Sequence, residues 1–302
     1  MGLSVALELE QRGVRATVFE PGLALRQASA AAAGMLAAED PHNPPELRAI
    51  SLYSAGLYAG YLARLQALGG LAVPAQTTVA VQHGRDGSTQ RIEEISVDPR
   101  QLAAALLAAV HAAGIDLREQ YTPTPEALQG RTLIVAAGAW SGGFGAVPIV
   151  PRKGQMLRVA LPPSLSGLRE VHRNDAVYVV PRTSGPQAGT ALIGATVEDA
   201  GFNTETDAPA LRWLRQRAAE LLPALADEAA APAVESWAGL RPATPDALPV
   251  IGYGDDGVLW ATGHYRNGIL LAPATARVVA DLLQQREPAV SLAEFSPQRF
   301  AR

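Results

Sequence analysis

The sequence contains no cysteine among its 302 residues. This absence excludes disulfides, cysteine-ligated zinc, thiolate nucleophiles and any cofactor tethered through a cysteine sulfur. Histidine is also scarce, with five residues and no pair at the spacing of metal ligands. We therefore expect no bound metal.

Long hydrophobic runs, a basic leader and a strong excess of one charge are lacking as well. No apolar run reaches the roughly 18 residues that a membrane span requires. No basic segment precedes an apolar one at the N-terminus, so a signal peptide is not expected. The formal net charge is −4, without a long basic run, which disfavours nucleic acid as a partner. We expect a cytoplasmic protein that acts on a small molecule.

What is present is enough apolar sequence for a large core. Hydrophobic residues make up 48% of the chain and charged residues only 18%, which argues against disorder. Strand–helix units are predicted at the start, at 98–141 and at 258–285, with segments typical of antiparallel sheet between them. This order predicts an α/β fold: a Rossmann-like nucleotide-binding domain (1–50, 98–145 and 236–302) and an inserted antiparallel-sheet, α+β domain (51–97 and 146–235).

The opening stretch, MGLSVALELEQRGVRATVFEPG, predicts a helix that stops at Gly13 and a short strand that ends at Glu20. In a dinucleotide-binding unit, an acidic residue about 20 positions beyond the first glycines binds the ribose. Gly2 and Glu20 fit the last fingerprint glycine and the ribose ligand. Alternatively, Gly2 is incidental and Glu20 is a solvated strand end. The first interpretation leaves the fingerprint's first strand outside this chain, which predicts an open sheet edge beside residues 15–20 and weak binding of the dinucleotide.

Other elements are predicted from hydrophobic period and capping signals. Asp98 followed by Pro99 is typical of a helix start, so a helix is expected over 99–111. A loop of small residues is expected over 28–37, and a buried strand that breaks into a glycine turn over 131–141. Further helices are expected over 47–68, 209–222 and 269–285, and a strand over 77–82.

Six stretches, in order, resemble one family, the flavoprotein oxidases that include glycine oxidase, D-amino-acid oxidase and sarcosine oxidase. The stretches are SAAAAGML (29–36), LIVAAGAWS (133–141), PRKGQML (151–157), VYVVPR (177–182), GLRPATPDALPVIG (239–252) and ATGHYRNGILLAPATA (261–276). The last one is most similar to glycine oxidase. The resemblance covers most of the chain, although 70–98 and 115–131 are short beside the family pattern.

The resemblance implies FAD as the cofactor. Because the chain has no cysteine, we expect the FAD to be non-covalent. The turn GHYRNG leads into a helix whose N-terminus would stabilise negative charge on the reduced flavin. His264 in this turn is interpreted as a structural histidine rather than a base. The residues expected to hold FAD are Gly2, Glu20, Ser29, Ala33, Gly34, Ala137, Gly138, Gly263, His264, Asn267, Gly268 and Ile269.

Oxidation of an amine beside a carboxylate requires a cation that fixes the carboxylate. Arg241, in GLRP, is the first candidate because a guanidinium offers a bidentate fork; the alternative is pairing with a local acid such as Asp246. Tyr178 could donate to the same carboxylate, and Arg266 is a second candidate cation. Met35 would form an apolar wall, although Tyr178 and Met35 also suit ordinary packing. No acid–base side chain is required if the amine arrives neutral, so we assign no catalytic residue.

The sequence thus predicts an FAD-dependent oxidase of glycine or a small amino acid. Hydride would pass from the α-carbon to the flavin, giving an imino acid and hydrogen peroxide, and the family context implies a link to thiamine biosynthesis. An FAD-dependent amino-acid dehydrogenase with another electron acceptor is the nearest alternative. Oxidation of a modified tRNA base is disfavoured by the acidic charge, and a non-catalytic remnant stays open. A homo-oligomer is compatible with the sequence.

Overall fold

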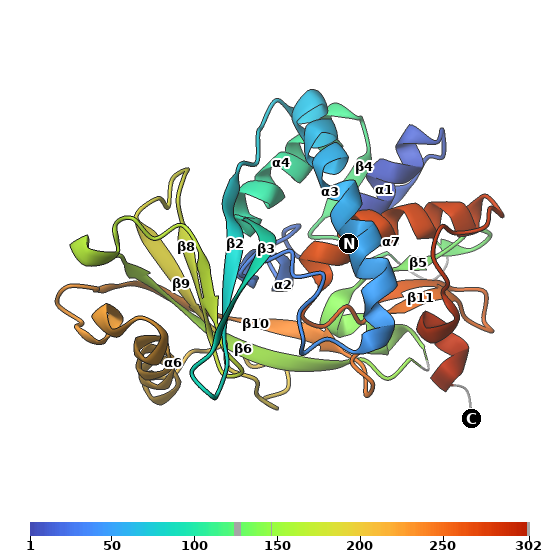
Figure 1. Ribbon diagram of the computed structural model, residues 1–302. Helices are drawn as coiled ribbons and strands as arrows, with labels where there is room; N and C mark the ends of the chain where they lie inside the picture. The colour runs from blue at the N-terminus through green and yellow to red at the C-terminus, as the bar shows by residue number, and fades with distance from the viewer. Residues whose placement is uncertain (124–127, 146, 301–302) are drawn as a thin grey trace.

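The computed structural model describes residues 1–123, 128–145 and 147–300. A group of helices lies on one side of the molecule and a large sheet on the other (Figure 1). The helices of the first side are α1 (Gly2–Gln11), α3 (Arg48–Gly69), α4 (Pro99–Ala112) and α7 (Gly268–Leu283). Asp98 caps α4 as predicted, because its side chain accepts a hydrogen bond from the Arg100 N–H.

The large sheet has seven strands in the order β10-β6-β9-β8-β7-β2-β3. Its neighbours are antiparallel except for the parallel pair β2 and β7. The strands are β2 (Ala75–His83), β3 (Thr89–Val97), β6 (Val150–Ala160), β7 (Val171–Arg173), β8 (Tyr178–Arg182), β9 (Thr190–Gly194) and β10 (Ala233–Ala243). Helix α6 (Ala208–Leu221) packs its apolar side on one face of this sheet. The predicted α/β class with an inserted, mainly antiparallel sheet is confirmed.

Two short sheets lie among the helices. β1 (Thr17–Glu20) pairs in parallel with β4 (Asp116–Glu119), and β12 (Leu259–Thr262) lies between β11 (Val250–Tyr253) and β5 (Ile134–Val135). Within the described ranges, no strand pairs with the second edge of β1 or of β5. These strands therefore form two separate short sheets, and the second edge of β1 is open within these ranges, as expected beside residues 15–20.

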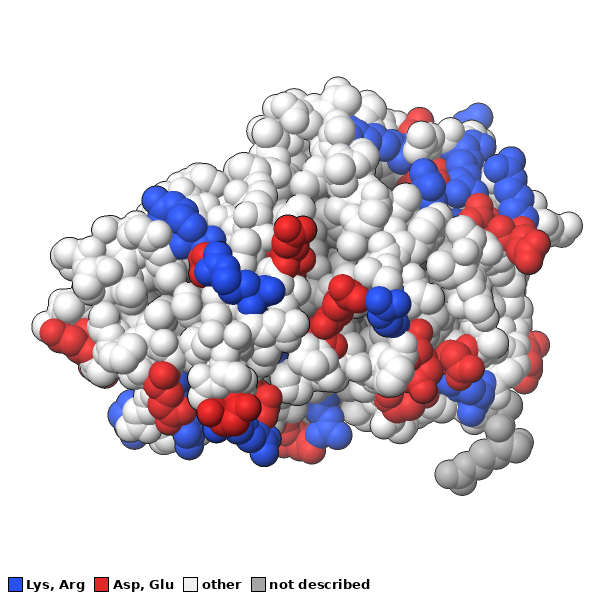
Figure 2. Space-filling view, in the orientation of Figure 1, with Lys and Arg blue, Asp and Glu red and all other residues white. Residues whose placement is uncertain are grey.

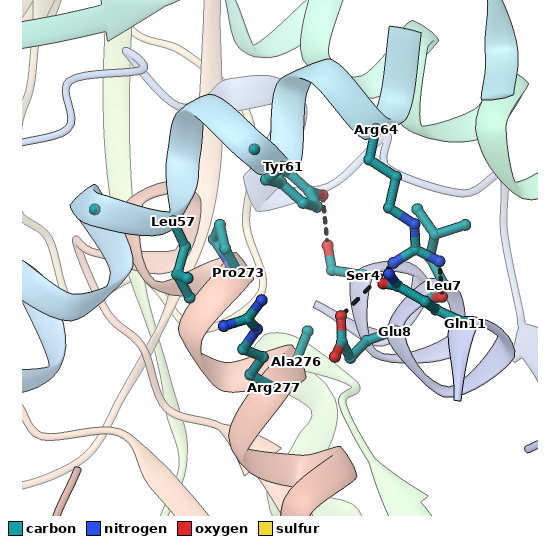
Figure 3. Close-up of a pocket in the computed structure, with 12 residues that line it drawn as sticks. Ser4, Leu7, Glu8, Gln11, Leu57, Tyr61, Arg64, Pro273, Ala276 and Arg277 are labelled. Atoms are coloured by element: carbon teal, nitrogen blue, oxygen red, sulfur yellow. Dashed lines mark hydrogen bonds and ion pairs between the residues drawn. The ribbon is translucent and has the colours of Figure 1, made fainter. Parts of the chain in front are cut away.

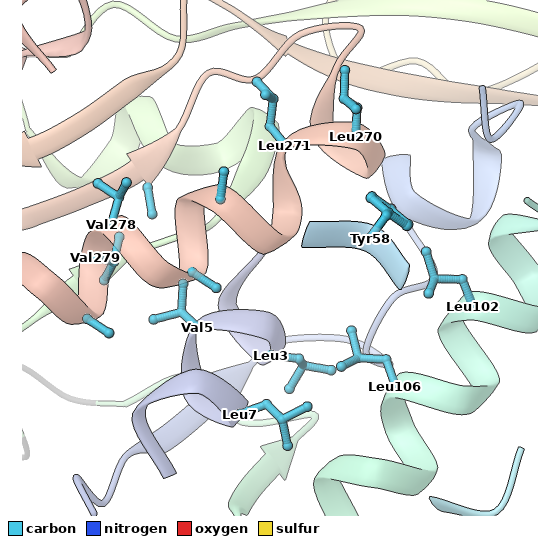
Figure 4. Packing of buried hydrophobic residues seen from close by; sticks show 14 of the residues in the cluster. Leu3, Val5, Leu7, Tyr58, Leu102, Leu106, Leu270, Leu271, Val278 and Val279 are labelled. Carbon is cyan, nitrogen blue, oxygen red and sulfur yellow. The ribbon is translucent and has the colours of Figure 1, made fainter. Parts of the chain in front are cut away.

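The main hydrophobic core joins α1, α3, α4 and α7 (Figure 4). Leu7, Tyr58, Leu106 and Leu271 are among its buried side chains. Helix α3 therefore packs with α1, α4 and α7, whereas the predicted boundary at 50/51 cuts through this helix. The boundary at 235/236 likewise falls inside β10. Apolar spacing shows that one helix face is buried, but it does not say against which partner.

Several elements differ from the expectations in detail. The loop expected over 28–37 contains a one-turn helix, α2 (Ala28–Ala31). The strand expected over 131–141 is only the two-residue β5, followed by a 3-10 helix, η2 (Gly138–Phe144). β3, β4, β7, β10 and β11 were not predicted, because their polar, exposed or short stretches give a weak alternating pattern.

Helix α7 contains Pro273 in its second turn. Proline has no N–H, so the carbonyl of Ile269, four residues earlier, has no partner within the helix. The Tyr58 hydroxyl of α3 donates to this carbonyl at 2.7 Å. Ser54, also on α3, donates to the Leu270 carbonyl at 2.6 Å and accepts from the Ala274 N–H at 3.2 Å. The first turns of α7 are thus held by side chains of α3.

We predict that Tyr58→Phe lowers the free energy of unfolding by about 1–2 kcal/mol, because the Ile269 carbonyl loses its donor while the ring remains. Urea denaturation would measure the change. Tyr53→Phe on the same helix is the matched control, since no hydrogen bond of the Tyr53 hydroxyl is seen among the described residues. Equal stability of the two variants would contradict the role of Tyr58.

Candidate active site

The candidate substrate site lies on the face of the large sheet opposite α6. Side chains alternate along a strand, so Tyr178 on β8 and Arg241 on β10 share this face with Gly154 on β6. A Cβ added at Gly154 would lie only 2.3–2.5 Å from the Arg241 guanidinium atoms. The glycine therefore leaves the space in which the guanidinium lies against the sheet.

Backbone carbonyls fix one end of the Arg241 guanidinium. Its Nη1 donates to the carbonyls of Thr196 at 3.1 Å and of Lys153 at 3.4 Å. Asp246, the alternative partner, instead binds Arg299 at 2.7 Å, so that alternative is wrong. No carboxylate lies within ion-pair distance of Arg241 in the described ranges. Arg241 is therefore a half-buried cation with capacity for an anion.

Tyr178 lies beside this cation. Its hydroxyl donates to the sulfur of Met156 at 3.3 Å, and both groups occupy the space that a side chain at Gly194 would fill. Burial raises the pKa of Tyr178, while the charges of Arg241 and Arg266 oppose that shift. The hydroxyl therefore stays protonated at neutral pH, and a substrate oxygen would compete only with a weak sulfur acceptor for its proton. Met35 packs on the same apolar cluster as Tyr178 and Met156.

Three of the predicted nucleotide-binding residues, Gly2, Glu20 and His264, lie near the first turn of α1. A Cβ at Gly2 would touch the Cβ of Ala136, just after β5, at 3.5 Å. Burial lowers the pKa of the Met1 amine, while Glu20 raises it. Burial lowers the pKa of His264, and the positive charge of the Met1 amine lowers it further. Gly2, Glu20 and His264 thus lie in one region, at the ends of strands β1, β5 and β12.

The turn after β12 is built on glycine and paired amides. Gly263 has a positive φ of 72°, where a side chain would be strained. Asn267, at the start of α7, exchanges amide hydrogen bonds of 2.9 and 3.4 Å with Asn43. His264 is buried and its Nε2 lies 3.0 Å from the Thr275 hydroxyl, as expected for a structural histidine. No side chain caps the turn that begins at Gly268 and Ile269.

The glycine turn after β5 is open above its backbone. Gly138 has a positive φ of 55°, and nothing lies within 4 Å of the position of a Cβ. Its carbonyl accepts from the Thr262 hydroxyl at 3.3 Å, which ties the turn to β12. Ala137 precedes it at the start of η2. This turn therefore allows close approach of a ligand to the backbone.

A further predicted cofactor segment connects the two halves of the molecule. Ser29 lies in α2, and Ala33 and Gly34 follow it; we call residues 31–35 the connecting loop. Gly34 has a positive φ of 91°, and a Cβ there would lie 2.0 Å from the Val97 carbonyl. Only glycine fits at this position.

The backbone geometry around these residues suits FAD. The N-terminal turns of α1 and α7 have no capping side chain, so their free N–H groups and positive helix ends are available for anionic groups. The turn at Gly138 permits backbone contact, because nothing lies within 4 Å of the position of a Cβ there. Gly2, Glu20, Gly138, Gly268 and their neighbours would hold the dinucleotide.

Several residues of the candidate site were not predicted from the sequence, namely Asn43, Gly154, Met156, Arg182, Gly194 and Trp237. Side chains alternate between the two faces of a strand, so every second residue from Tyr178 on β8 and from Arg241 on β10 shares their face. This pattern leads to Arg182 and Trp237. Asn43 gave no local signal, because its partner lies more than 200 residues away.

Two surface features lie outside this site. A groove of about 360 Å³ between α1, α3 and α7 is crossed by the Ser4–Tyr61 hydrogen bond and bordered by Arg64 and Glu8 (Figure 3). None of the predicted site residues lines it. Positive and negative side chains are interspersed on the face shown in Figure 2. In the described part of the chain, no cluster of three metal-ligating side chains occurs, and no helix is both long and apolar enough to cross a membrane.

Comparison with known proteins gives consistent matches. The family model described as FAD dependent oxidoreductase (DAO) matches residues 93–282. Glycine oxidase of Pseudomonas aeruginosa is 31% identical, over 98% of this chain and 96% of that protein. The bifunctional protein ThiO/ThiG of Trichormus variabilis is 32% identical over 99% of this chain, and the chain spans about half, 54%, of that relative's length.

Solved structures match over nearly the whole chain. Glycine oxidase from Geobacillus kaustophilus has a TM-score of 0.89 at 28% identity and covers 99% of this chain and 95% of its own. Iminodiacetate oxidase from Chelativorans sp. BNC1 has a TM-score of 0.83 at 21% identity, with 98% and 96% covered. The second match concerns the fold alone.

We predict a stability difference that depends on His264. Burial lowers its pKa from 6.5 to about 3. Between these values the unfolded chain binds a proton that the folded chain does not, so stability falls as the pH drops below 6.5. The loss reaches about 2 kcal/mol at pH 5.

His264→Gln removes this titration, so its stability should fall less between pH 7.5 and pH 5 than that of the unchanged protein. Urea denaturation at both pH values measures the two differences. An identical pH dependence in both proteins would show that His264 does not titrate as described.

Proposed function

The chain belongs to the FAD-dependent oxidoreductase family described as DAO, and we propose that it oxidises glycine or another small amino acid. The product would be an imino acid, which hydrolyses, and oxygen would be the acceptor, giving hydrogen peroxide. The glycine oxidase relatives support this choice of substrate class. FAD is the cofactor of the family.

One observation carries the proposal: the Arg241 guanidinium has no carboxylate partner among the described residues and lies beside a protonated hydroxyl. Its Nη1 is fixed by two carbonyls, which leaves other N–H groups for a substrate carboxylate. Tyr178 provides a further donor. An α-amino acid presents a carboxylate of this kind, one carbon away from the bond to be oxidised.

The charge around Tyr178 also suits the chemistry. The charged groups that act on its hydroxyl are all arginines, Arg241, Arg266 and Arg182. Positive surroundings lower the pKa of a nearby ammonium group. They therefore favour the neutral form of the substrate amine, from which oxidation proceeds without a dedicated basic side chain. Met35 and Met156 exclude water on the apolar side of the site.

FAD supplies the two-electron acceptor when it is bound. The first turn of α7 presents free N–H groups and the positive end of a helix dipole, and it would stabilise negative charge on the reduced flavin. Gly263, whose positive φ of 72° favours glycine, shapes the turn that leads into this helix. The protein's part is to hold and orient the carboxylate, keep the site dry and provide these fixed dipoles.

We predict that Arg241→Ala raises the KM for glycine about 100-fold or more, since a charge-assisted bidentate contact contributes roughly 3 kcal/mol. Arg241→Lys should raise the KM less than Arg241→Ala does, because lysine keeps the charge but cannot make the bidentate contact. Steady-state kinetics measure both. Arg217→Ala, on the outer helix α6, is the matched control. An unchanged KM in Arg241→Ala with intact folding would remove Arg241 from the substrate site.

We predict that acid precipitation releases all bound flavin, because the chain has no cysteine for a sulfur tether. Absorbance of the supernatant at 450 nm should account for all of the flavin that the protein carried before precipitation. Yellow colour in the washed pellet would contradict it. Peroxide formed with glycine then separates oxidase from dehydrogenase: a dehydrogenase would reduce an artificial acceptor but leave oxygen unreduced.

A further inference from the structure

The sheet face that carries the substrate residues also holds the connecting loop, residues 31–35. The Trp237 indole Nε1 donates to the Ala31 carbonyl at 3.1 Å. Nη2 of Arg182 donates to the Ala33 carbonyl at 2.8 Å. Two side chains of the substrate-side sheet therefore bind alternate carbonyls of a loop that begins in the nucleotide-binding half.

The positions of these donors follow a simple rule. Trp237 stands four residues before Arg241 on β10, and Arg182 stands four residues after Tyr178 on β8. Residues separated by four in a strand lie on the same face, about 13 Å apart. Each strand thus carries one residue for the substrate and one for the connecting loop. Two rigid strands fix the distance between them.

The same loop is anchored on its other side. The Gly34 carbonyl accepts from the Val97 N–H at 2.9 Å, and the Leu36 N–H donates to the Ile95 carbonyl at 2.9 Å. At the sheet, a Cβ on Gly239 would lie 2.4 Å from the Cβ of Ala31. The connecting loop therefore lies directly on β10 and is clamped between β10, β8 and β3.

Arg182 is an unusual residue to anchor the connecting loop. It is 1% exposed, and its Nε and Nη1 have no partner among the described residues. Burying a guanidinium with one hydrogen bond is costly. Trp237 is likewise held in place, with Arg100 and Arg158 over its ring and Glu235 bound to both arginines. Such costly contacts are expected where geometry matters for function.

We propose that Trp237 and Arg182 are positioning residues that set the connecting loop, and with it Met35 and the cofactor, at a fixed distance from Arg241 and Tyr178. The inference rests on the proposed function, because it takes these residues as the substrate site. Neither residue touches the substrate. They act through the carbonyls of Ala31 and Ala33.

The first test is Trp237→Phe, which keeps an aromatic ring but removes the indole N–H together with the second ring. We expect binding of acetate, a carboxylate that cannot be oxidised, to the FAD-loaded enzyme to be unchanged, because Arg241 and Tyr178 remain. The rate at which glycine reduces bound FAD without oxygen should fall about tenfold, up to about 100-fold for a loop displacement near 1 Å. FAD should also dissociate faster. Trp213→Phe, on the outer helix α6, is the matched control.

Arg182 gives a second, independent test. Arg182→Met removes the charge and the donor, whereas Arg182→Lys keeps the charge and one donor. We expect slower flavin reduction and weaker FAD binding in the first variant, with partial recovery in the second.

The possible results separate the two proposals. A lower melting temperature with unchanged flavin reduction and unchanged FAD affinity in Trp237→Phe would show a merely structural role and overturn the inference. If glycine and other small amino acids fail to reduce FAD in the unaltered protein, the proposed function fails. In that case the FAD dissociation constants still test whether Trp237 and Arg182 hold the connecting loop. They are compared among Trp237→Phe, its control Trp213→Phe, Arg182→Met and Arg182→Lys.

Discussion

The structure depends on helix α7 keeping its first turns although Pro273 interrupts their hydrogen bonds. The side chains of Tyr58 and Ser54 on α3 supply the replacement contacts. Without them, a carbonyl in the first turn of α7 would be left without a partner. Through this contact α3 packs with α7, and the turn from Gly263 to Gly268 is held in place at the start of this helix.

The substrate side is built differently, mainly from space left by glycine. Gly154 lets the Arg241 guanidinium lie on the sheet, and Gly194 gives room to the Tyr178 hydroxyl and the Met156 sulfur. The polar groups that remain available are donors and cations. A site of this kind selects a small anion that has little bulk beside it, which agrees with an amino acid whose side chain is small or absent.

The sequence alone predicted the fold class, the cap at Asp98 and the grouping of Arg241 with Tyr178, because these rest on local patterns or on ordered motifs. It did not predict the position of α3 or the roles of Asn43 and Trp237. Their partners are distant in the chain, and no local period reports them. The alternative pairing of Arg241 with Asp246 was open for the same reason: only the folded chain shows that Arg299 takes this carboxylate.

The spacing of residues along β8 and β10 restricts where insertions and deletions can occur in this sequence. Each strand carries one proposed substrate residue and one proposed anchor of the connecting loop, four residues apart on one face. Inserting or deleting a single residue between Trp237 and Arg241 would turn one of them toward α6. The exposed hairpin turn at 84–88 has no such restriction. In descendants of this chain, length variation should accumulate in the turns, while these two intervals keep their residue count even where the residues between them change.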